Sequence, residues 1–326
     1  MFDPKLLVIV GPTAVGKTAL AIELAERLNG EIVSADSRLF YRGMDIGTAK
    51  PSPADRARVP HHLIDVTEPD RPWSLARFQS AAFAAIAAIQ ARARLPLLVG
   101  GTGQYVRAIV EGWTLPSGEP DLTLRRDLEA FAAEHGADAL HARLAALDPA
   151  AAAKIDPRNV RRAARALEYT LGAGAPISHS QKKSPPPYPI LQIGLTLPRP
   201  ALYARIDARV EAMIAAGLVA EVQALVAKGY AWNLPAMSGL GYRQIGEYLR
   251  GECDLPEAIR RIKSDTRKFV RRQGAWFRQN DPTIVFSDVK KVLNPCSMAY
   301  KPLFVKDKEG VFDIFVLTNV VPRINC

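Results

Sequence analysis

An eight-residue motif near the start of the chain constrains the fold more than any other feature. Residues Gly11–Thr18 read Gly-Pro-Thr-Ala-Val-Gly-Lys-Thr, between an apolar run at Leu6–Val10 and an amphipathic stretch at Thr18–Leu28. This match to G-x-x-x-x-G-K-[ST], placed between a predicted strand and a predicted helix, is typical of a phosphate-binding loop. It predicts an α/β fold, with a P-loop NTPase-like parallel sheet flanked by helices.

Linked phosphates are the expected ligand of this loop. Its backbone N–H groups form an anion nest, and the helix N-terminus adds roughly half a positive charge. Lys17 would supply a mobile cation, and Thr18 would offer its hydroxyl to Mg²⁺, the cofactor that we predict. The residues expected to bind a diphosphate are Gly11, Pro12, Thr13, Ala14, Val15, Gly16, Lys17 and Thr18.

The composition suits a protein that binds a polyanion. The 326 residues carry a net charge of +10, which favours a partner such as nucleic acid. No apolar run reaches the roughly 18–20 residues that span a bilayer, and Asp3 and Lys5 make the first ten residues unlike a signal peptide. The three cysteines have no metal or disulfide spacing. We expect a cytoplasmic monomer without membrane association.

A carboxylate follows the second predicted strand, Glu31–Asp36. Ligands of open parallel sheets bind beyond the carboxyl ends of the strands, so Asp36 is expected to face the phosphate loop. The open roles are a general base, a Mg²⁺ partner through water, or the local structural role of a helix N-cap or turn residue. The polar loop that runs from Asp36 to Pro51 adds Arg38, Arg42 and Lys50 beside the same crevice.

These two segments resemble the tRNA dimethylallyltransferases. The resemblance rests on Gly-Pro-Thr-Ala-Val-Gly-Lys-Thr and on Asp-Ser-Arg-x-x-Tyr-Arg-Gly-Met-Asp-Ile-Gly-Thr-Ala-Lys-Pro, and it covers residues 4–288. It implies transfer of a dimethylallyl group from dimethylallyl diphosphate to N6 of adenosine 37 in tRNA, with release of diphosphate. It implies catalytic roles for Asp36, Lys17, Thr18 and Arg209, while Arg205 stays open as the diphosphate-binding arginine. The lack of a following Cys/His zinc module resembles the bacterial members.

The middle of the chain changes character. Between residues 116 and 187 strand signals disappear, and Ala, Arg and Leu recur at helical spacing. We therefore predict an all-helical insertion domain, 116–187, that divides the sheet domain into 1–115 and 188–288. A C-terminal appendage of unknown role, 289–326, contains a β-like run at 310–321.

Arginine stripes on two predicted helices indicate RNA binding. Asp156-Pro157 is expected to start a helix that carries Arg158, Arg161, Arg162 and Arg165 on one face. A second helix, 260–279, places Arg260, Arg267, Arg271 and Arg278 on one face and Arg261, Lys268 and Arg272 beside it. Of its interleaved aromatics, Phe269 is expected in the core.

Two glycine-spaced turns complete the candidate RNA site. Gly-Gly-Thr-Gly follows the predicted strand Leu95–Val99, and Ser238–Gln244 offers a tyrosine and a cation that could stack on or pair with a base. Together with the resemblance, these segments give the expected tRNA contacts: Asp36, Ser37, Arg38, Leu39, Thr102, Arg125, Arg158, Asn159, Val160, Arg161, Arg162, Gly241, Tyr242, Arg243, Gln244, Arg271, Arg272 and Arg278.

Two other functions stay open on the residues alone. A P-loop nucleotide kinase that uses ATP would explain the phosphate loop and Asp36, but not the two arginine stripes. A non-enzymatic RNA-binding protein with a vestigial loop would explain only the stripes. The adjacent His61 and His62 are expected to be structural, because neighbours on a strand face opposite sides and cannot share a metal ion.

Overall fold

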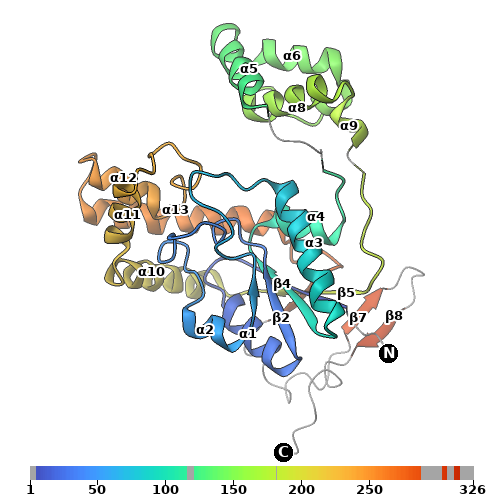
Figure 1. Cartoon of the computed structure of the whole chain (residues 1–326), viewed down its shortest axis with the longest axis vertical. Helices are drawn as coiled ribbons and strands as arrows, with labels where there is room; N and C mark the ends of the chain where they lie inside the picture. Colours follow the sequence, from blue (N-terminus) through green and yellow to red (C-terminus); the bar gives the residue numbers. More distant parts are fainter. Residues whose placement is uncertain (1–4, 116–120, 181, 288–302, 307–311, 316–326) are drawn as a thin grey trace, which may run out of the picture. The chain divides into compact units, whose positions relative to one another are not determined.

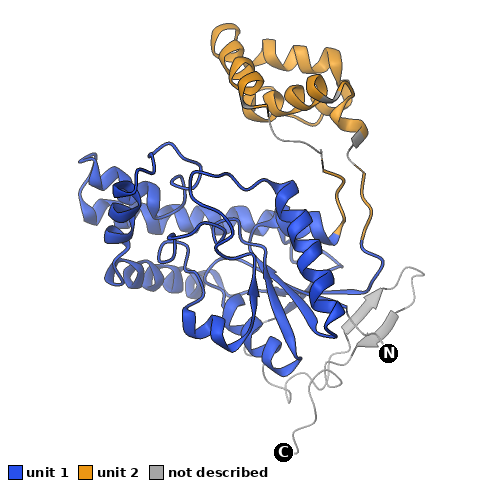
Figure 2. Cartoon of the chain, in the orientation of Figure 1, with its two compact units in different colours: residues 1–110, 186–326 blue, residues 111–185 orange. Residues whose placement is uncertain are grey.

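The computed structural model describes residues 5–115, 121–180, 182–287, 303–306 and 312–315. It divides the chain into two compact units, 1–110 with 186–326 and 111–185 (Figure 2). The second unit therefore begins earlier and ends earlier than the predicted insertion domain.

A six-stranded parallel sheet forms the centre of the first unit (Figure 1). In the order in which they pair, its strands are β3 (His61–His62), β2 (Gly30–Ser34), β4 (Leu95–Gly100), β1 (Leu6–Val10), β5 (Ile190–Leu195) and β6 (Val285–Ser287). Every residue of β1 is buried, as expected for a parallel strand covered on both faces. This architecture confirms the predicted P-loop NTPase-like fold class.

Helices cover both faces of this sheet (Figure 1). Alternate residues of β1 point to opposite faces: Leu7 belongs to the same core as α1 (Lys17–Arg27) and α10 (Arg199–Ala215), and Val8 to that of α3 (Leu75–Ala91) and α4 (Gly103–Val110). The short α2 (Pro53–Arg58) begins at a capping box on Ser52.

A helical cluster extends the first unit beyond the sheet. It joins α10 to the three helices that follow it in sequence, and it buries Tyr41 and Met44 from the loop after β2. These helices are α11 (Leu218–Ala227), α12 (Tyr242–Leu249) and α13 (Leu255–Trp276). The predicted helices at 200–216 and 218–228 are confirmed. The basic helix α13 starts and ends earlier than predicted, so that Arg278 lies beyond its end.

The second unit is all-helical, as predicted. Its helices are α5 (Leu122–His135), α6 (Ala137–Leu147), α7 (Pro149–Ala152), α8 (Val160–Ala173) and α9 (Ile177–Ser180). Leu128, Leu140, Leu144 and Leu167 are buried in its core.

The predicted helix start at Asp156-Pro157 is wrong. The α8 helix begins at Val160, because the Asn159 side chain accepts a 3.1 Å hydrogen bond from the Arg162 N–H and so caps the helix. Arg158 therefore lies outside the helix, and the stripe that α8 carries is shorter than predicted.

The described part of the C-terminal region is a two-stranded antiparallel ladder. It consists of β7 (Leu303–Lys306) and β8 (Phe312–Phe315). The β-like run predicted at 310–321 contains β8, and its remaining residues lie outside the described ranges, as do Cys296 and Cys326. Within the described residues no single helix has the length and apolar character to cross a membrane. Among these residues, only the pair of α10 and α11, which are bent by 56° at their junction, reaches that length and composition when the two are taken together.

Candidate functional site

The phosphate loop has the backbone shape that its glycines permit. Gly16, the N-cap of α1, has a φ of 111°, and a Cβ on Gly11 would lie 2.7 Å from the Leu195 carbonyl oxygen. Lys17 Nζ donates hydrogen bonds to the carbonyl oxygens of Gly11 (3.0 Å) and Pro12 (2.8 Å). The lysine thus lies folded over the loop, with its ammonium at the place where a phosphate group would bind.

The electrostatic environment of Lys17 is unusual for a lysine. Burial of the ammonium lowers its pKa to about 8, the Asp36 carboxylate raises it in part, and the Arg209 guanidinium lowers it again. Burial disfavours the charged form because it removes water from the ammonium. An anionic ligand in the loop would restore a favourable environment for that charge.

This pKa predicts a pH dependence of diphosphate binding. If only protonated Lys17 attracts the anion, affinity is full well below pH 8 and is lost as the pH rises through that value. Inorganic diphosphate should bind about tenfold more weakly at pH 9 than at pH 7, as measured by calorimetry. A Lys17→Arg variant keeps its charge over this range and should give a flat profile. A flat profile in the unaltered protein would contradict the assignment.

Two arginines of α10 reach the phosphate loop. Arg209 Nη1 donates to Thr13 Oγ1 at 3.3 Å, and Arg205 Nη1 donates to the Val15 carbonyl oxygen at 3.3 Å. Burial lowers the pKa of Arg209, and the Asp36 carboxylate opposes that shift. Since Arg209 interacts electrostatically with both Lys17 and Asp36, it is the better placed of the two for a diphosphate.

Asp36 lies beside the loop, as predicted, at the carboxyl end of β2. It lines an open pocket together with Lys17, Thr18, Ser34, Leu39 and His61, among others. Its Oδ1 accepts a 3.0 Å hydrogen bond from the Arg38 N–H, which closes a local turn. The helix N-cap interpretation is wrong, since the next helix, α2, starts at Pro53 with Ser52 as its cap.

The Gly-Gly-Thr-Gly turn after β4 packs against protein. A Cβ on Gly100 would lie 2.3 Å from the Ala35 carbonyl oxygen, and one on Gly103 would lie 2.2 Å from Trp276 Cγ. The close approach that these two glycines permit is therefore to the segment before Asp36 and to α13. Thr102 between them accepts a 3.3 Å hydrogen bond from the Ser37 N–H, which brings it beside Asp36.

The cations of the loop after Asp36 are largely engaged with the protein itself. Arg38 donates to the Pro235 carbonyl oxygen at 2.9 Å, and Arg42 pairs with Glu68 at 2.9 Å. The Lys50 side chain, only 1% exposed, pairs with Asp45 and Asp65. Of the three cations expected beside the crevice, Arg42 and Lys50 are therefore paired with carboxylates of the protein itself, and Lys50 stabilises the loop.

The Gly-Tyr-Arg-Gln segment at the start of α12 packs near the loop after Asp36 and shares the partner Glu221 with it. Tyr242 is buried, and its hydroxyl donates to Glu221 Oε1 at 2.6 Å. The same carboxylate accepts backbone N–H groups of Asp45, Ile46 and Gly47. The prediction that Tyr242 stacks on a base is therefore wrong, because its ring lies in the core.

Gln244 and its neighbours require the same correction. Gln244 is buried, accepts from the Gly241 N–H at 3.0 Å and donates to Asp265 at 2.9 Å. Arg243 is exposed, but it pairs with Asp265 at 2.7 Å. Burial removes Tyr242 and Gln244 from the candidate tRNA surface and leaves Arg243 as its remaining side chain from this segment.

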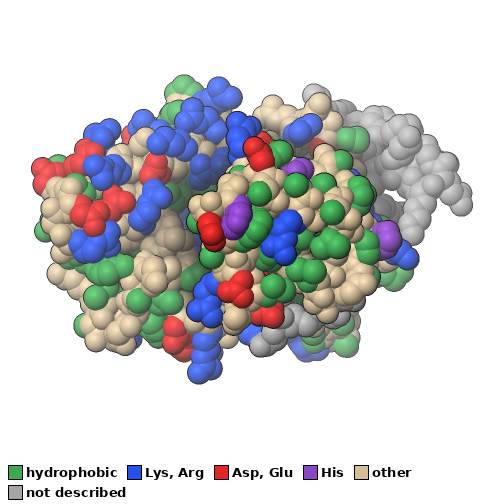
Figure 3. Space-filling model, turned by 90° about the horizontal axis from the view of Figure 1, so that it is seen from above, with side chains coloured by type: hydrophobic (Ala, Val, Ile, Leu, Met, Phe, Trp, Pro, Cys, Tyr) green, Lys and Arg blue, Asp and Glu red, His purple; other side chains and the backbone are tan. Residues whose placement is uncertain are grey.

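Acidic partners neutralise the first half of the basic stripe on α13. Glu257 pairs with Arg260 and Arg261, Asp207 with Arg267, and Asp265 with Lys268. Both basic and acidic side chains lie on the face seen in Figure 3. Net charge alone therefore does not mark a binding surface.

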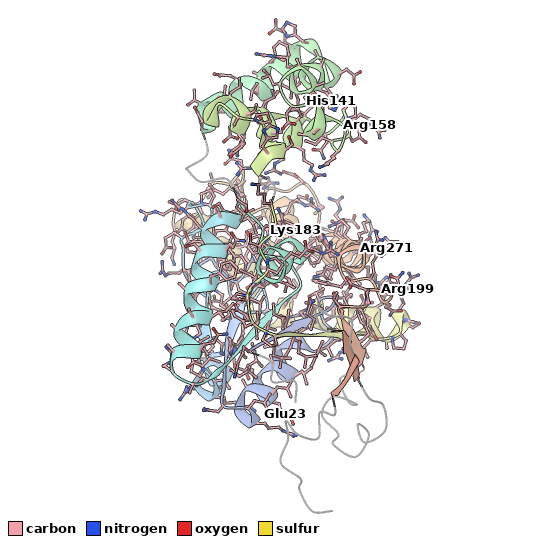
Figure 4. The ribbon with its side chains drawn as sticks, turned by 90° about the vertical axis from the view of Figure 1, so that its right-hand side faces the viewer. Glu23, His141, Arg158, Lys183, Arg199 and Arg271 are labelled. Carbon is pink, nitrogen blue, oxygen red and sulfur yellow. The ribbon has the colours of Figure 1, made fainter. Side chains whose placement is uncertain are left out.

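The second half of α13 and the segment after it keep their positive charge. Arg271 and Arg278 are exposed and have no ion pair with any described residue, and Arg272 lies over the partly buried ring of Phe269. Phe269 belongs to no hydrophobic cluster of the described residues, so its expected core position is wrong. Figure 4 shows Arg271 at the outer edge of the first unit.

The arginines of the second unit divide in the same way. Arg125 forms a mostly buried pair with Glu168, and Arg158 pairs with Asp156, whose pKa it lowers to about 2. Arg161 and Arg162 on α8 are exposed, with no side-chain partner among the described residues. These two are the better candidates for an RNA contact.

Comparison with known proteins identifies the family. The model of the IPP transferase family matches residues 39–280, and that of the isopentenyl transferase family matches residues 4–62. The tRNA dimethylallyltransferase of Roseiflexus sp. (strain RS-1) is 63% identical over 274 residues, 84% of this chain and 90% of that protein. The chain belongs to the tRNA dimethylallyltransferase family. The Chloroflexus aurantiacus enzyme (strain ATCC 29366 / DSM 635 / J-10-fl) is 59% identical over 275 residues, 84% of this chain and 93% of that protein.

Solved structures of family members have the same fold. The tRNA isopentenylpyrophosphate transferase of Bacillus halodurans aligns with a TM-score of 0.65 at 43% identity, over 88% of this chain and 90% of that one. A eukaryotic dimethylallyltransferase acting on tRNA aligns with a TM-score of 0.74 at 27% identity, over 88% of this chain and 74% of that one.

Several residues that shape the site gave no signal in the sequence. Gln273 accepts a hydrogen bond from the phosphate loop at Thr13, and Glu221 accepts one from the loop after Asp36 at Ile46, but both come from distant helices. His61 lines the pocket, and its Nε2 is buried without a hydrogen-bond partner among the described residues, whereas His62 pairs with Glu31. Arg199, exposed at the start of α10, also has no ion pair there. His61 Nδ1 also lies 2.7 Å from the Val59 carbonyl oxygen, so both histidines have the structural contacts that were expected, and His61 lines the pocket in addition.

Proposed function

We propose that the protein transfers the dimethylallyl group of dimethylallyl diphosphate to N6 of adenosine 37 in tRNA and releases diphosphate. The observation that carries this proposal is the placement of Asp36 in one pocket with Lys17 and Thr18 of the phosphate loop. A leaving diphosphate and a reacting amine need such neighbouring sites. Membership of the tRNA dimethylallyltransferase family supports the choice of both substrates.

The chain's own groups supply the chemistry of transfer. The allylic C–O bond breaks as the N6 amine forms its C–N bond, and the electron pair of the C–O bond leaves with the diphosphate. Loop N–H groups, Lys17 and Arg209 stabilise the negative charge that develops there. The amine loses a proton, and the Asp36 carboxylate accepts it or orients the amine for its loss.

Mg²⁺ fits the residues that the pocket provides. The Thr18 side chain is exposed and lines the pocket with Asp36 and Ser34, and the described residues contain no group of three His, Cys, Asp or Glu that would bind a metal alone. Mg²⁺ usually takes few protein ligands and completes its shell with phosphate oxygens and water. Thr18 would hold the ion, which would neutralise charge on the diphosphate.

The tRNA would be held by the arginines that have no acidic partner. They include Arg271 and Arg278 in the first unit and Arg161 and Arg162 in the second, none of which has an ion pair with a described residue. The base must leave its stack to reach Asp36, which costs less in an anticodon loop than in a duplex. Since the loop, Asp36 and α13 belong to one unit of one chain, we propose a monomeric enzyme. We also propose that it acts in the cytoplasm, where a tRNA substrate would be found.

Loss of Arg271 should change the salt dependence of tRNA binding. Arg271→Ala should weaken binding and reduce the slope of log K against log salt by about 0.7–0.9, the share of one phosphate contact. Arg260→Ala is the matched variant on the same helix and should change the slope less, because Glu257 already neutralises Arg260. Filter binding across a salt series measures both. An unchanged slope in Arg271→Ala would assign this face to solvent.

The direct test is incubation with labelled dimethylallyl diphosphate and bulk tRNA. Digestion of the tRNA should yield a labelled nucleoside modified at N6, in amounts that depend on both substrates. ATP should neither replace dimethylallyl diphosphate as a donor nor compete strongly with it. Phosphoryl transfer from ATP without prenyl transfer would show a kinase, and tRNA binding without any transfer would show a non-enzymatic RNA-binding protein.

A further inference from the structure

A buried glutamine on α13 joins two segments of the site that are far apart in sequence. Gln273 is 4% exposed. Its Oε1 accepts a 2.9 Å hydrogen bond from the Thr13 N–H, and its Nε2 donates a 3.0 Å hydrogen bond to the Gly101 carbonyl oxygen. Both polar ends of the side chain are therefore paired with backbone, one with the phosphate loop and one with the turn after β4.

These two partners fix the orientation of the carboxamide. The Thr13 N–H can only donate and the Gly101 carbonyl can only accept, so the oxygen must face the loop and the nitrogen must face the turn. The fit is close, because a Cβ on Gly101 would lie 2.3 Å from Gln273 Nε2. A glycine at 101 and an amide at 273 therefore form one matched arrangement.

The two hydrogen bonds of the Gln273 side chain, to Thr13 and Gly101, form a bridge between these segments. Each of its two partners is close to a residue of the proposed mechanism. On one side, the Thr13 hydroxyl accepts from Arg209, which is placed for the diphosphate. On the other, Thr102 follows Gly101 and accepts from the Ser37 N–H, next to Asp36. Gln273 thus lies between the residues that would hold the leaving group and those that would receive the amine.

We infer that Gln273 is a positioning residue that sets the separation of the diphosphate site and the amine site. This inference rests on the proposed function, since transfer requires the diphosphate and the amine to be held at a fixed distance from each other. Gln273 touches neither substrate and acts through Thr13 and Gly101. A misplacement of about 1 Å between reacting groups can cost about 10²-fold in rate, so the bridge affects the rate of transfer more than the binding of either substrate.

The turn of α13 that contains Gln273 also presents exposed cations to solvent. Arg271 and Arg272, the residues before Gln273, are exposed, and Trp276, one turn later, covers Gly103 and lies under the guanidinium of Arg107. The helix turn that presents the candidate tRNA surface therefore also holds the bridge. Loss of the bridge should leave this outer surface, and hence tRNA affinity, unchanged.

Two variants separate positioning from general support. Gln273→Met keeps the approximate size and removes both hydrogen bonds, whereas Gln273→Glu keeps the acceptor for Thr13 and faces an oxygen toward the Gly101 carbonyl. We expect kcat for transfer to fall about 10–100-fold in both, with KM for tRNA within about twofold of the unaltered value. Gln79→Met is the control, because the Gln79 amide joins α3 to α4 away from the loop, donating to the Ala108 carbonyl oxygen at 2.8 Å.

A further measurement keeps the inference testable even if turnover is too low to measure. Exchange of the Thr13 amide hydrogen should become faster in Gln273→Met than in Gln79→Met, at temperatures well below unfolding for both. A kcat within about twofold of the unaltered value in both Gln273 variants, or an equal loss in Gln79→Met, would overturn the inference. Absence of transfer by the unaltered protein would instead overturn the proposed function.

Discussion

Replacement of Asp36 by asparagine is expected to lower kcat for prenyl transfer by about 10²–10⁴-fold, the usual contribution of a general base. Asparagine keeps the size of the side chain and the oxygen that accepts the Arg38 N–H, so the turn after β2 should persist. It cannot accept a proton from the amine. Single-turnover transfer to an anticodon stem-loop, with substrates saturating, measures this loss directly.

The affinity for tRNA serves as the control for this variant. Because the candidate phosphate contacts lie on other segments, the Kd of Asp36→Asn for tRNA should stay within about twofold of the unaltered value. Retained turnover would remove Asp36 from catalysis. A loss of tRNA binding equal to the loss of rate would make Asp36 a binding residue only.

The second large effect is expected for Lys17→Met. Loss of the ammonium removes a cation from the developing diphosphate, and kcat/KM for dimethylallyl diphosphate should fall by about 10²–10³-fold, as when one preorganised donor is lost from an active site. The two hydrogen bonds from Lys17 to the Gly11 and Pro12 carbonyl oxygens are lost as well. Steady-state kinetics with varied dimethylallyl diphosphate measure the effect.

A lysine outside the loop separates a local effect from a general loss of charge. Lys228 is exposed at the end of α11, and Lys228→Met should leave the kinetics unchanged. Both variants should bind tRNA with similar affinity. Unchanged kinetics in Lys17→Met would mean that the loop does not hold the donor's diphosphate.

The sequence predicted best the parts of the site that short segments determine. The strand, loop and helix around Lys17 follow from one motif, because its glycines and the preceding apolar run act locally. Asp36 could be placed beside the loop because parallel strands end at one edge of the sheet. Both predictions needed only neighbours along the chain and one general rule of topology.

Partners from distant segments explain most of the errors. Tyr242 looked like a base-stacking residue, but it lies in the core, where its hydroxyl donates a hydrogen bond to Glu221 of another helix. Arg267 looked free until Asp207 of α10 was placed opposite it. A charge or an aromatic ring looks the same in sequence whether it faces solvent or a partner. Periodicity therefore identifies the helix face but not the residues that pack against it.

Local rules also gave conflicting signals in one place. Pro157 suits the first turn of a helix, and the sequence therefore favoured a start at Asp156. Asn159 is also a good N-cap, and its bond to the Arg162 N–H starts the helix later. The structure uses the second signal, with Asn159 as the N-cap, which is why the position of Arg158 was predicted wrongly.

A structure of the ternary complex would test the central claim most directly. The complex would contain Mg²⁺, an anticodon stem-loop and dimethylallyl S-thiolodiphosphate, whose C–S bond resists ionisation. The account predicts the diphosphate on the N–H groups of the loop with Lys17 and Arg209, and the N6 amine of adenosine 37 within hydrogen-bond distance of the Asp36 carboxylate. A diphosphate bound away from the loop, or an adenine whose N6 faces away from Asp36, would contradict it.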